Sequence, residues 1–301
     1  MTIVDSPALA RDHHTRTSPV WQVQAEIMKI RTTKLWRLLL VGIFVVTVWS
    51  LLRNGASHHY ELNPPLDQFP VNERASAVAA AAQAHTAAGQ AAIAADMMTS
   101  GQFFGVLVTM LLGVQVVTNE YAHQTATATF LTNPHRGAVI AAKFAAAIAF
   151  GGLFWAVSTS VNLVATPIYL HSEHINVALT DWVPMRSALL NLLAYAMWSV
   201  FGVGLGSLFR GQVAAVVTGS AIYLGGAGAV LVIFNLIHLA YQQSWVLAAP
   251  VIAPAIASLV MITPGRAFDH APPQWVGLVV MAGYATLLGT IGTLGTRRRD
   301  I

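Results

Sequence analysis

Long apolar runs constrain this chain more than any other feature of its sequence. A membrane-spanning helix needs about 20 mostly apolar residues. Only 9% of the 301 residues are charged, whereas a soluble domain carries about 25%. Six runs are long and apolar enough to cross a bilayer: 35–52, 101–118, 144–169, 187–209, 213–236 and 276–294. We therefore predict an all-α integral membrane protein with six transmembrane helices.

Two further apolar segments are interrupted by polar residues or proline. The alanine-rich stretch 75–95 contains glutamine, histidine and threonine, and alanine adds little insertion energy, so we expect a helix outside the bilayer. Segment 245–263 is broken by Pro250 and Pro254. Because irregular backbone within a membrane must be sheltered by protein, we expect a re-entrant hairpin that enters from the outer face before the sixth span.

The distribution of lysine and arginine predicts the orientation, because these residues collect in cytoplasmic loops. With six spans, twelve of the sixteen basic residues lie on the side of the two termini, and seven acidic residues lie on the other side. One extra span would place the basic cluster 297–299 outside; two extra spans would place segment 120–136 outside. We expect a multi-pass protein of the bacterial inner membrane with both termini in the cytoplasm.

This topology divides the chain into a short series of parts. The expected parts are a cytoplasmic tail with an amphipathic helix (1–34), a six-helix transmembrane domain (35–296) that includes an outer loop (53–100), a cytoplasmic segment (119–137) and the outer hairpin (240–275), and a basic tail (297–301).

Residues 20–34 predict an amphipathic helix ahead of the first span. Gln22, Glu26 and Lys29 share one polar stripe, and apolar residues occupy the rest of the surface. Such a helix lies along the membrane surface. It could be a plain interfacial anchor or could also contact a partner, and the sequence favours neither.

The segment between the second and third spans combines charged residues with turn residues. Asn119 can cap a short helix with Glu120 in its first turn, and Asn133 with Pro134 would end it. A short cytoplasmic helix of this kind suits docking to a soluble partner. From these residues alone, an ordinary connecting loop is the simpler interpretation.

The order of residues in this segment resembles that of ABC-2-type ABC transporter permeases, and so do the entry helix, the six spans and the broken outer hairpin. The residues that carry the resemblance are Glu120, Thr125, Leu131, Pro134, Arg136 and Lys143. The resemblance implies a coupling helix that contacts a separate ATPase through Glu120, His123, Thr125, Leu131, Pro134 and Arg136, and an outer gate at Pro250 and Pro254. It also implies a second permease subunit, identical or different.

No GxxxxGK[ST] motif is present, so we expect ATP and Mg²⁺ to bind to the partner ATPase. The expected function is the permease subunit of an ABC exporter that moves an amphiphilic, lipid or drug-like substrate outward. The alternatives are an ATP-independent transporter or channel, and a membrane sensor or scaffold that uses the outer loop. No acidic residue lies in the middle of a span, which argues against a proton-driven antiporter.

Polar residues within the spans could line a substrate path, although interhelical hydrogen bonds are their commoner role. They are Gln115, Asn162, Asn191, Tyr195 and Asn235. Two glycine series, at 202, 204 and 206 and at 225, 226 and 228, permit close helix approach within one subunit or between two.

Other classes of site have little support in the sequence. The histidine pairs 58/59 and 171/174 are too few to hold a metal, and we expect them to be solvated in loops. Cysteine is absent, as are the G-x-S-x-G and H-E-x-x-H motifs of hydrolases, so we expect no catalytic set. The basic residues flank the apolar runs and do not form one patch, which argues against a nucleic-acid partner.

Overall fold

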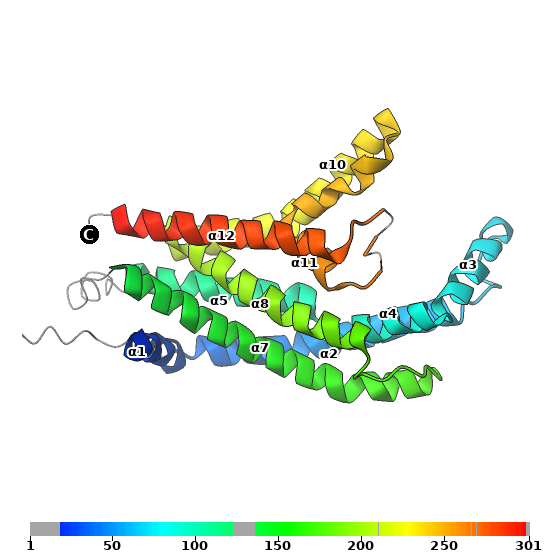
Figure 1. Ribbon diagram of the computed structural model, residues 1–301, viewed down its shortest axis with the longest axis horizontal. Coiled ribbons are helices and arrows are strands. Elements are labelled where there is room, and N and C mark those ends of the chain that lie inside the picture. Colours follow the sequence, from blue (N-terminus) through cyan, green and yellow to red (C-terminus); the bar gives the residue numbers. More distant parts are fainter. Residues whose placement is uncertain (1–18, 123–135, 210, 266, 269, 299–301) are drawn as a thin grey trace, which may run out of the picture.

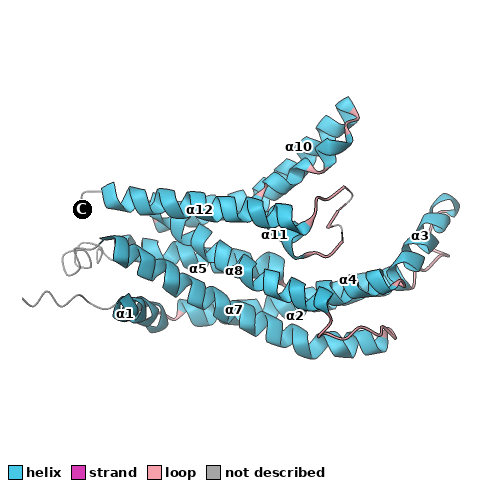
Figure 2. Cartoon of the chain, viewed as in Figure 1, coloured by secondary structure: helices cyan, strands magenta, loops and turns pink. Residues whose placement is uncertain are grey.

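The computed structural model describes residues 19–122, 136–209, 211–265, 267–268 and 270–298. Within these ranges the chain is helical with short connections and contains no β-strand (Figure 2). Six helical stretches are long and apolar enough to cross a membrane, which confirms the predicted class of fold.

The helices are, in chain order, α1 (Pro19–Thr32), α2 (Leu35–Leu62), α3 (Val71–Ala84), α4 (Ala87–Met98), α5 (Gln102–Ala122), α7 (Arg136–Ser172), α8 (Trp182–Leu208), α9 (Gln212–Ser220), the π-helix η1 (Ala221–Gly225), α10 (Gly226–Tyr241), the short 3₁₀ helices η2 (Ser244–Leu247) and η3 (Ala249–Ile252), α11 (Pro254–Ile262) and α12 (Gln274–Arg298).

Helix α1 lies across one end of the bundle and α12 ends at the same end (Figure 1). We call this the α1 end and the opposite end, where α3 projects, the α3 end. Glu26 and Ile30 of α1 are buried, whereas Trp21 and Met28 are exposed. The predicted amphipathic helix is therefore present, and its polar stripe faces the bundle at Glu26.

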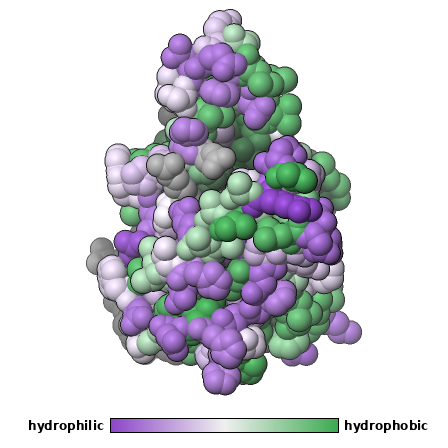
Figure 3. All heavy atoms as spheres, turned by 90° about the vertical axis from the view of Figure 1, so that its right-hand side faces the viewer, coloured by the Kyte–Doolittle hydropathy of each residue, from purple (hydrophilic) through white to green (hydrophobic). Residues whose placement is uncertain are grey.

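Several helices continue beyond the predicted spans toward the α3 end. Helix α2 ends at Leu62 rather than at residue 52. The 37 residues of α7 correspond to about 55 Å of helix, about 25 Å more than a hydrocarbon core is thick. Figure 3 looks onto this end and shows many hydrophilic residues there. The predicted outer loop 53–100 is thus largely helical.

The alanine-rich stretch forms two helices rather than the single helix that we expected. The chain breaks between α3 and α4, where the Thr86 hydroxyl accepts a hydrogen bond from the Gly89 amide at 3.1 Å and caps α4. Ile93 and Met97 of α4 pack in a hydrophobic cluster with Leu51 and Leu170. Of these two helices, α3 stands apart from the bundle, whereas α4 forms one apolar stretch with α5.

Buried polar side chains satisfy the backbone at the α4–α5 break. Gly101 has a φ of +86°, and a Cβ there would lie 2.8 Å from the Thr47 hydroxyl, so the turn requires glycine. The Asn162 amide donates to the carbonyl oxygens of Met98 and Ser100, at 3.0 and 3.1 Å. These contacts fasten the start of α5 to α7.

Replacing Asn162 with leucine should therefore destabilise the protein by about 1–3 kcal/mol, because the buried carbonyl groups of Met98 and Ser100 each lose a hydrogen bond. Asn235→Leu is the matched control, since Asn235 is exposed on α10 and should change stability by less than about 0.5 kcal/mol. Thermal unfolding in detergent micelles measures both. Equal midpoints for the two variants would contradict the assigned role of Asn162.

Helix α8 occupies the centre of the bundle and packs against α5, α7 and α12. Its glycines allow the close approach. A Cβ at Gly202 would lie 2.2 Å from the Met110 carbonyl oxygen of α5, and one at Gly204 would lie 2.5 Å from the Leu288 carbonyl oxygen of α12. The first glycine series therefore serves packing within one subunit.

The second glycine series lies where the fifth long helical stretch turns away from the bundle. Figure 1 shows α10 diverging from the other helices, beyond the π-helix η1, and α10 has no buried residue. A Cβ at Gly225, Gly226 or Gly228 would meet no atom within 4 Å. This surface has no packing partner within the described part of the chain.

The proline-broken segment bends sharply before α12. The η2–η3 stretch and α11 meet at 102°. Pro254 occupies the first turn of α11, where its missing N–H costs no hydrogen bond, and Pro250 is buried. The Gln102 amide donates to the Ser258 hydroxyl at 2.6 Å. The bent pair is therefore joined to the α4–α5 break.

Candidate functional site

Four charged side chains from three helices meet at the α1 end of the bundle. Lys29 of α1 contacts Glu26 of the same helix and Glu120 of α5, each at 2.7 Å. Lys143 of α7 contacts Glu26 at 2.9 Å and Glu120 at 2.7 Å. Each lysine therefore pairs with both glutamates, and we call these four side chains the charge network.

Three members of the charge network are withdrawn from solvent. The side chains of Lys143, Glu26 and Glu120 are 4%, 6% and 9% exposed, whereas that of Lys29 is 45% exposed. Buried ions are tolerated when they are paired and hydrogen-bonded, and removal of one partner is costly. The network has no net charge, so α1, α5 and α7 can separate there only by leaving buried charges unpaired.

Helix electrostatics does not explain the position of Glu120. The acid lies in the last turn of α5, where the helix dipole disfavours a negative charge. The two lysines offset this penalty. The prediction that Asn119 caps a new helix beginning at Glu120 is wrong, because α5 continues through both residues to Ala122 and Glu120 is held there by its ion pairs.

The pKa of Lys29 reflects the same contacts. Partial burial acts to lower it, but hydrogen bonds and charge attraction from Glu120 and Glu26 outweigh that effect and raise the pKa above its ordinary value of 10.5. A raised lysine pKa gives stabilisation that is present at neutral pH and is lost only as the pH rises through the folded-state value. The ion pairs of Lys29 therefore persist throughout the neutral range.

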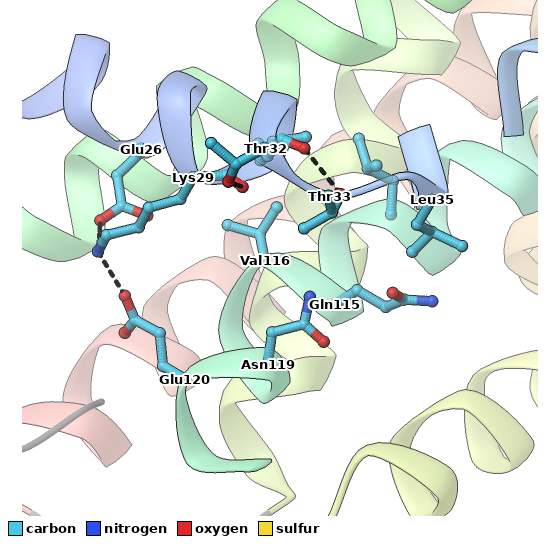
Figure 4. Close-up of a pocket in the computed structure, with 11 residues that line it drawn as sticks. Glu26, Lys29, Thr32, Thr33, Leu35, Gln115, Val116, Asn119 and Glu120 are labelled. Atoms are coloured by element: carbon cyan, nitrogen blue, oxygen red, sulfur yellow. Dashed lines mark hydrogen bonds and ion pairs between the residues drawn. The ribbon is translucent and has the colours of Figure 1, made fainter. Parts of the chain in front are cut away.

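A cavity of about 340 Å³ lies beside the charge network, between α5 and the corner where α1 joins α2. Figure 4 shows Glu26 and Lys29 above it and Glu120, Asn119 and Gln115 on α5 below it. Its apolar walls are Ile30, Leu35, Leu112 and Val116. The cavity thus joins charged and amide groups to an apolar surface.

Only part of the predicted coupling segment falls within the described residues. His123, Thr125, Leu131 and Pro134 lie outside them, and Arg136 begins α7. The described part of α5 ends two residues after Glu120, and that of α7 begins seven residues before Lys143. The charge network therefore holds both helices from which the segment emerges.

Sequence reasoning found the members of the charge network but missed how they associate. Gln22, Glu26 and Lys29 belonged to the predicted polar stripe of α1. Glu120 and Lys143 belonged to the segment after the second span. Gln22 is half-buried on α1. The predicted topology places these helix ends at the same membrane surface, and the ends carry opposite charges. That combination could have revealed the network.

The predicted substrate-path residues do not converge on one cavity. Gln115 lines the cavity beside the charge network, while Asn162 bonds backbone carbonyl groups. Asn191 and Tyr195 are fully buried in α8, and the Asn191 amide has no hydrogen-bond partner among the described residues. Asn235 is exposed on α10. Asn162 therefore makes interhelical hydrogen bonds, the commoner role of a polar residue within a span.

The expectation that His58 and His59 lie in a loop is wrong for both residues, and the expectation that they are solvated is wrong for His58. Both residues belong to α2, and the His58 side chain is only 16% exposed. Its ring nitrogens contact Glu61 at 3.0 Å and Asp96 of α4 at 2.9 Å, and His59 contacts Glu173 at 2.8 Å. The contact with Asp96 fastens α2 to α4, and the contact with Glu173 fastens it to the residue after α7. No cluster of three metal-binding side chains occurs in the described ranges.

No protein-family model matches the chain, and no curated protein matches it significantly.

Proposed function

We propose that this chain is the membrane permease subunit of an ABC-2-type exporter, driven by a separate ATPase. The observation that carries the proposal is the charge network, which joins the interfacial helix to both helices flanking the predicted coupling segment. A push on that segment would be transmitted to α1, α5 and α7 together, because their separation would expose unpaired buried charges.

In this proposal the chain transmits force and performs no chemistry. ATP and Mg²⁺ bind to the partner ATPase, since this chain has no phosphate-binding GxxxxGK[ST] motif. Closure of the partner moves segment 119–137. The movement rocks the bundle and opens an outer gate at the bend around Pro250 and Pro254, which we place as a re-entrant hairpin on the outer side. An amphiphilic, lipid or drug-like substrate then leaves outward.

A second permease subunit would complete the transporter. Helix α10 exposes Leu231, Val232 and Leu236, and the glycines at its start have open space beside them. Such small residues permit close packing between membrane helices. We propose this surface for contact with the second subunit or with lipid.

The proposed location is the bacterial inner membrane, with the α1 end in the cytoplasm. The chain contains no cysteine, so single-cysteine labelling reports sidedness directly. In intact cells, Ser76→Cys on α3 should react with a membrane-impermeant maleimide, and Gln24→Cys on α1 should react only after the membrane is opened. Labelling of Gln24→Cys in intact cells would overturn the orientation.

Co-purification tests the proposed function. A tagged chain extracted from its native membrane in mild detergent should bring down a polypeptide that contains a GxxxxGK[ST] motif, identified by mass spectrometry. Recovery of the intact chain without any such ATPase would count against the proposal. Nucleotide-independent transport by the chain alone in vesicles would favour a secondary transporter or channel instead.

The projecting helices at the α3 end favour a sensor or scaffold as the second candidate. Helix α3 stands apart from the bundle and is mostly exposed, so its deletion should leave the other helices folded. A scaffold built on α3 would lose its function in that variant, whereas an exporter should continue to transport.

A further inference from the structure

The cavity beside the charge network is lined by two kinds of surface. Four aliphatic side chains form its apolar walls, and charged and amide groups lie along its other side. A volume of about 340 Å³ is within the range of about 300–1,000 Å³ that small-molecule sites occupy. A ligand that matches these walls must itself be amphiphilic.

The polar side has donors that the protein does not use. An ammonium group has three N–H donors, and Lys29 uses two of them, on Glu26 and Glu120. Gln115 and Asn119 lie one turn apart on α5, and their amides make no hydrogen bond to the described residues. Figure 4 shows both side chains extending from α5 beneath the α1–α2 corner. These three groups suit an anionic oxygen such as that of a phosphate.

The same surface also offers acceptors for a cation. Each carboxylate oxygen of Glu26 accepts one lysine contact and can accept another, since an ionised carboxylate has about four lone-pair sites. Because the charge network is neutral, a ligand of one sign would unbalance it. A head group with one positive and one negative charge would keep the site neutral, and each of its charges could face a group of opposite charge in the network.

We propose that this cavity binds a phospholipid with a phosphoethanolamine-type head group from the adjoining membrane leaflet. The phosphate lies against Gln115, Asn119 and Lys29, and the ammonium group lies toward Glu26. The acyl region follows Leu35, Leu112 and Val116. The lipid thereby occupies the corner between the interfacial helix and the first long helix.

Native mass spectrometry of the purified chain, without ATPase or nucleotide, tests this inference separately from the proposed function. The probes are phosphatidylethanolamine, phosphatidylcholine and phosphatidylglycerol. The wild-type protein should retain phosphatidylethanolamine at least tenfold more strongly than the other two, because phosphatidylcholine lacks ammonium N–H donors and phosphatidylglycerol lacks the cation. Equal retention of the three lipids would overturn the proposal.

Gln115→Leu/Asn119→Leu should reduce phosphatidylethanolamine retention at least tenfold, since it removes both amides and keeps the charge network. The matched control is Thr286→Val/Thr290→Val, in a second groove of about 450 Å³ that no charged or amide residue lines. Unchanged retention in the amide variant would contradict the site.

A third measurement distinguishes a lipid from a soluble phosphate ester. Glycerophosphoethanolamine has the same head group without acyl chains. It should fail to displace the lipid at equal concentration, and displacement would overturn the lipid assignment. If the amide variant does not fold, the selectivity of the wild-type protein among the three lipids still decides the proposal.

Discussion

Replacing Lys143 with methionine should destabilise the protein by about 3–5 kcal/mol, the usual cost of removing one partner from a buried ion pair. Lys143 contacts both Glu26 and Glu120, whose side chains are 6% and 9% exposed. Without it, the two buried carboxylates lose the cation that they share and repel each other. The midpoint of thermal unfolding in detergent micelles should fall clearly.

A compensating variant separates charge balance from loss of packing. Lys143→Met/Glu120→Gln removes one charge of each sign and leaves Glu26 paired with Lys29, so it should recover most of the lost stability. Lys34→Met is the control, because Lys34 is exposed and should change stability by less than about 0.5 kcal/mol. A double variant no more stable than Lys143→Met would show that the ion pairs do not carry the effect.

Gly202→Ala should destabilise the bundle by about 1–3 kcal/mol, as overpacking commonly does. The new Cβ would lie 2.2 Å from the Met110 carbonyl oxygen. Because that atom belongs to the backbone of α5, no side-chain rotation relieves the contact, and α5 and α8 must move apart. Chemical or thermal unfolding of the purified variant measures the loss.

Gly226→Ala provides the matched comparison for that substitution. Its Cβ would meet no atom within 4 Å, so folding of one subunit should be unaffected or slightly improved. If α10 contacts a second subunit, this variant should weaken association and not folding. Equal destabilisation of the chain by both variants would contradict the assignment of the two glycine series.

The sequence predicted the helical class and the six long apolar helices because hydropathy reports directly on transfer into a bilayer. It could not predict how far α2 and α7 continue past residues 52 and 169. Polar residues lower the mean hydropathy there although the helix persists, and side-chain contacts such as that of His58 with Asp96 stabilise the extension. Hydropathy measures insertion and not helix length.

The members of the charge network could be identified from sequence but their pairing could not. Glu26 and Lys29 lie 91 or more residues from Glu120 and Lys143, and no local pattern reports such a contact. The break between α3 and α4 was missed for a different reason: alanine favours an unbroken helix, and the cap at Thr86 interrupts it. Long-range packing therefore decided the pairing, and a local cap decided the break.

Burial of Glu120 affects how coupling should be tested. Glu120→Lys would place a third positive charge beside Lys29 and Lys143, so it would perturb folding as well as any coupling. The balanced variant Lys143→Met/Glu120→Gln is the better probe. If the network transmits force, this variant should fold and bind the ATPase yet show ATP hydrolysis that is no longer tied to transport.

The most direct test of the proposed permease role is site-specific crosslinking in the native membrane. A photoreactive residue at position 125 should crosslink to a polypeptide that contains a GxxxxGK[ST] motif, whereas one at position 76 on α3 should not. Absence of such a product at position 125, or equal yields at both positions, would contradict the account of this chain as an ATPase-driven permease.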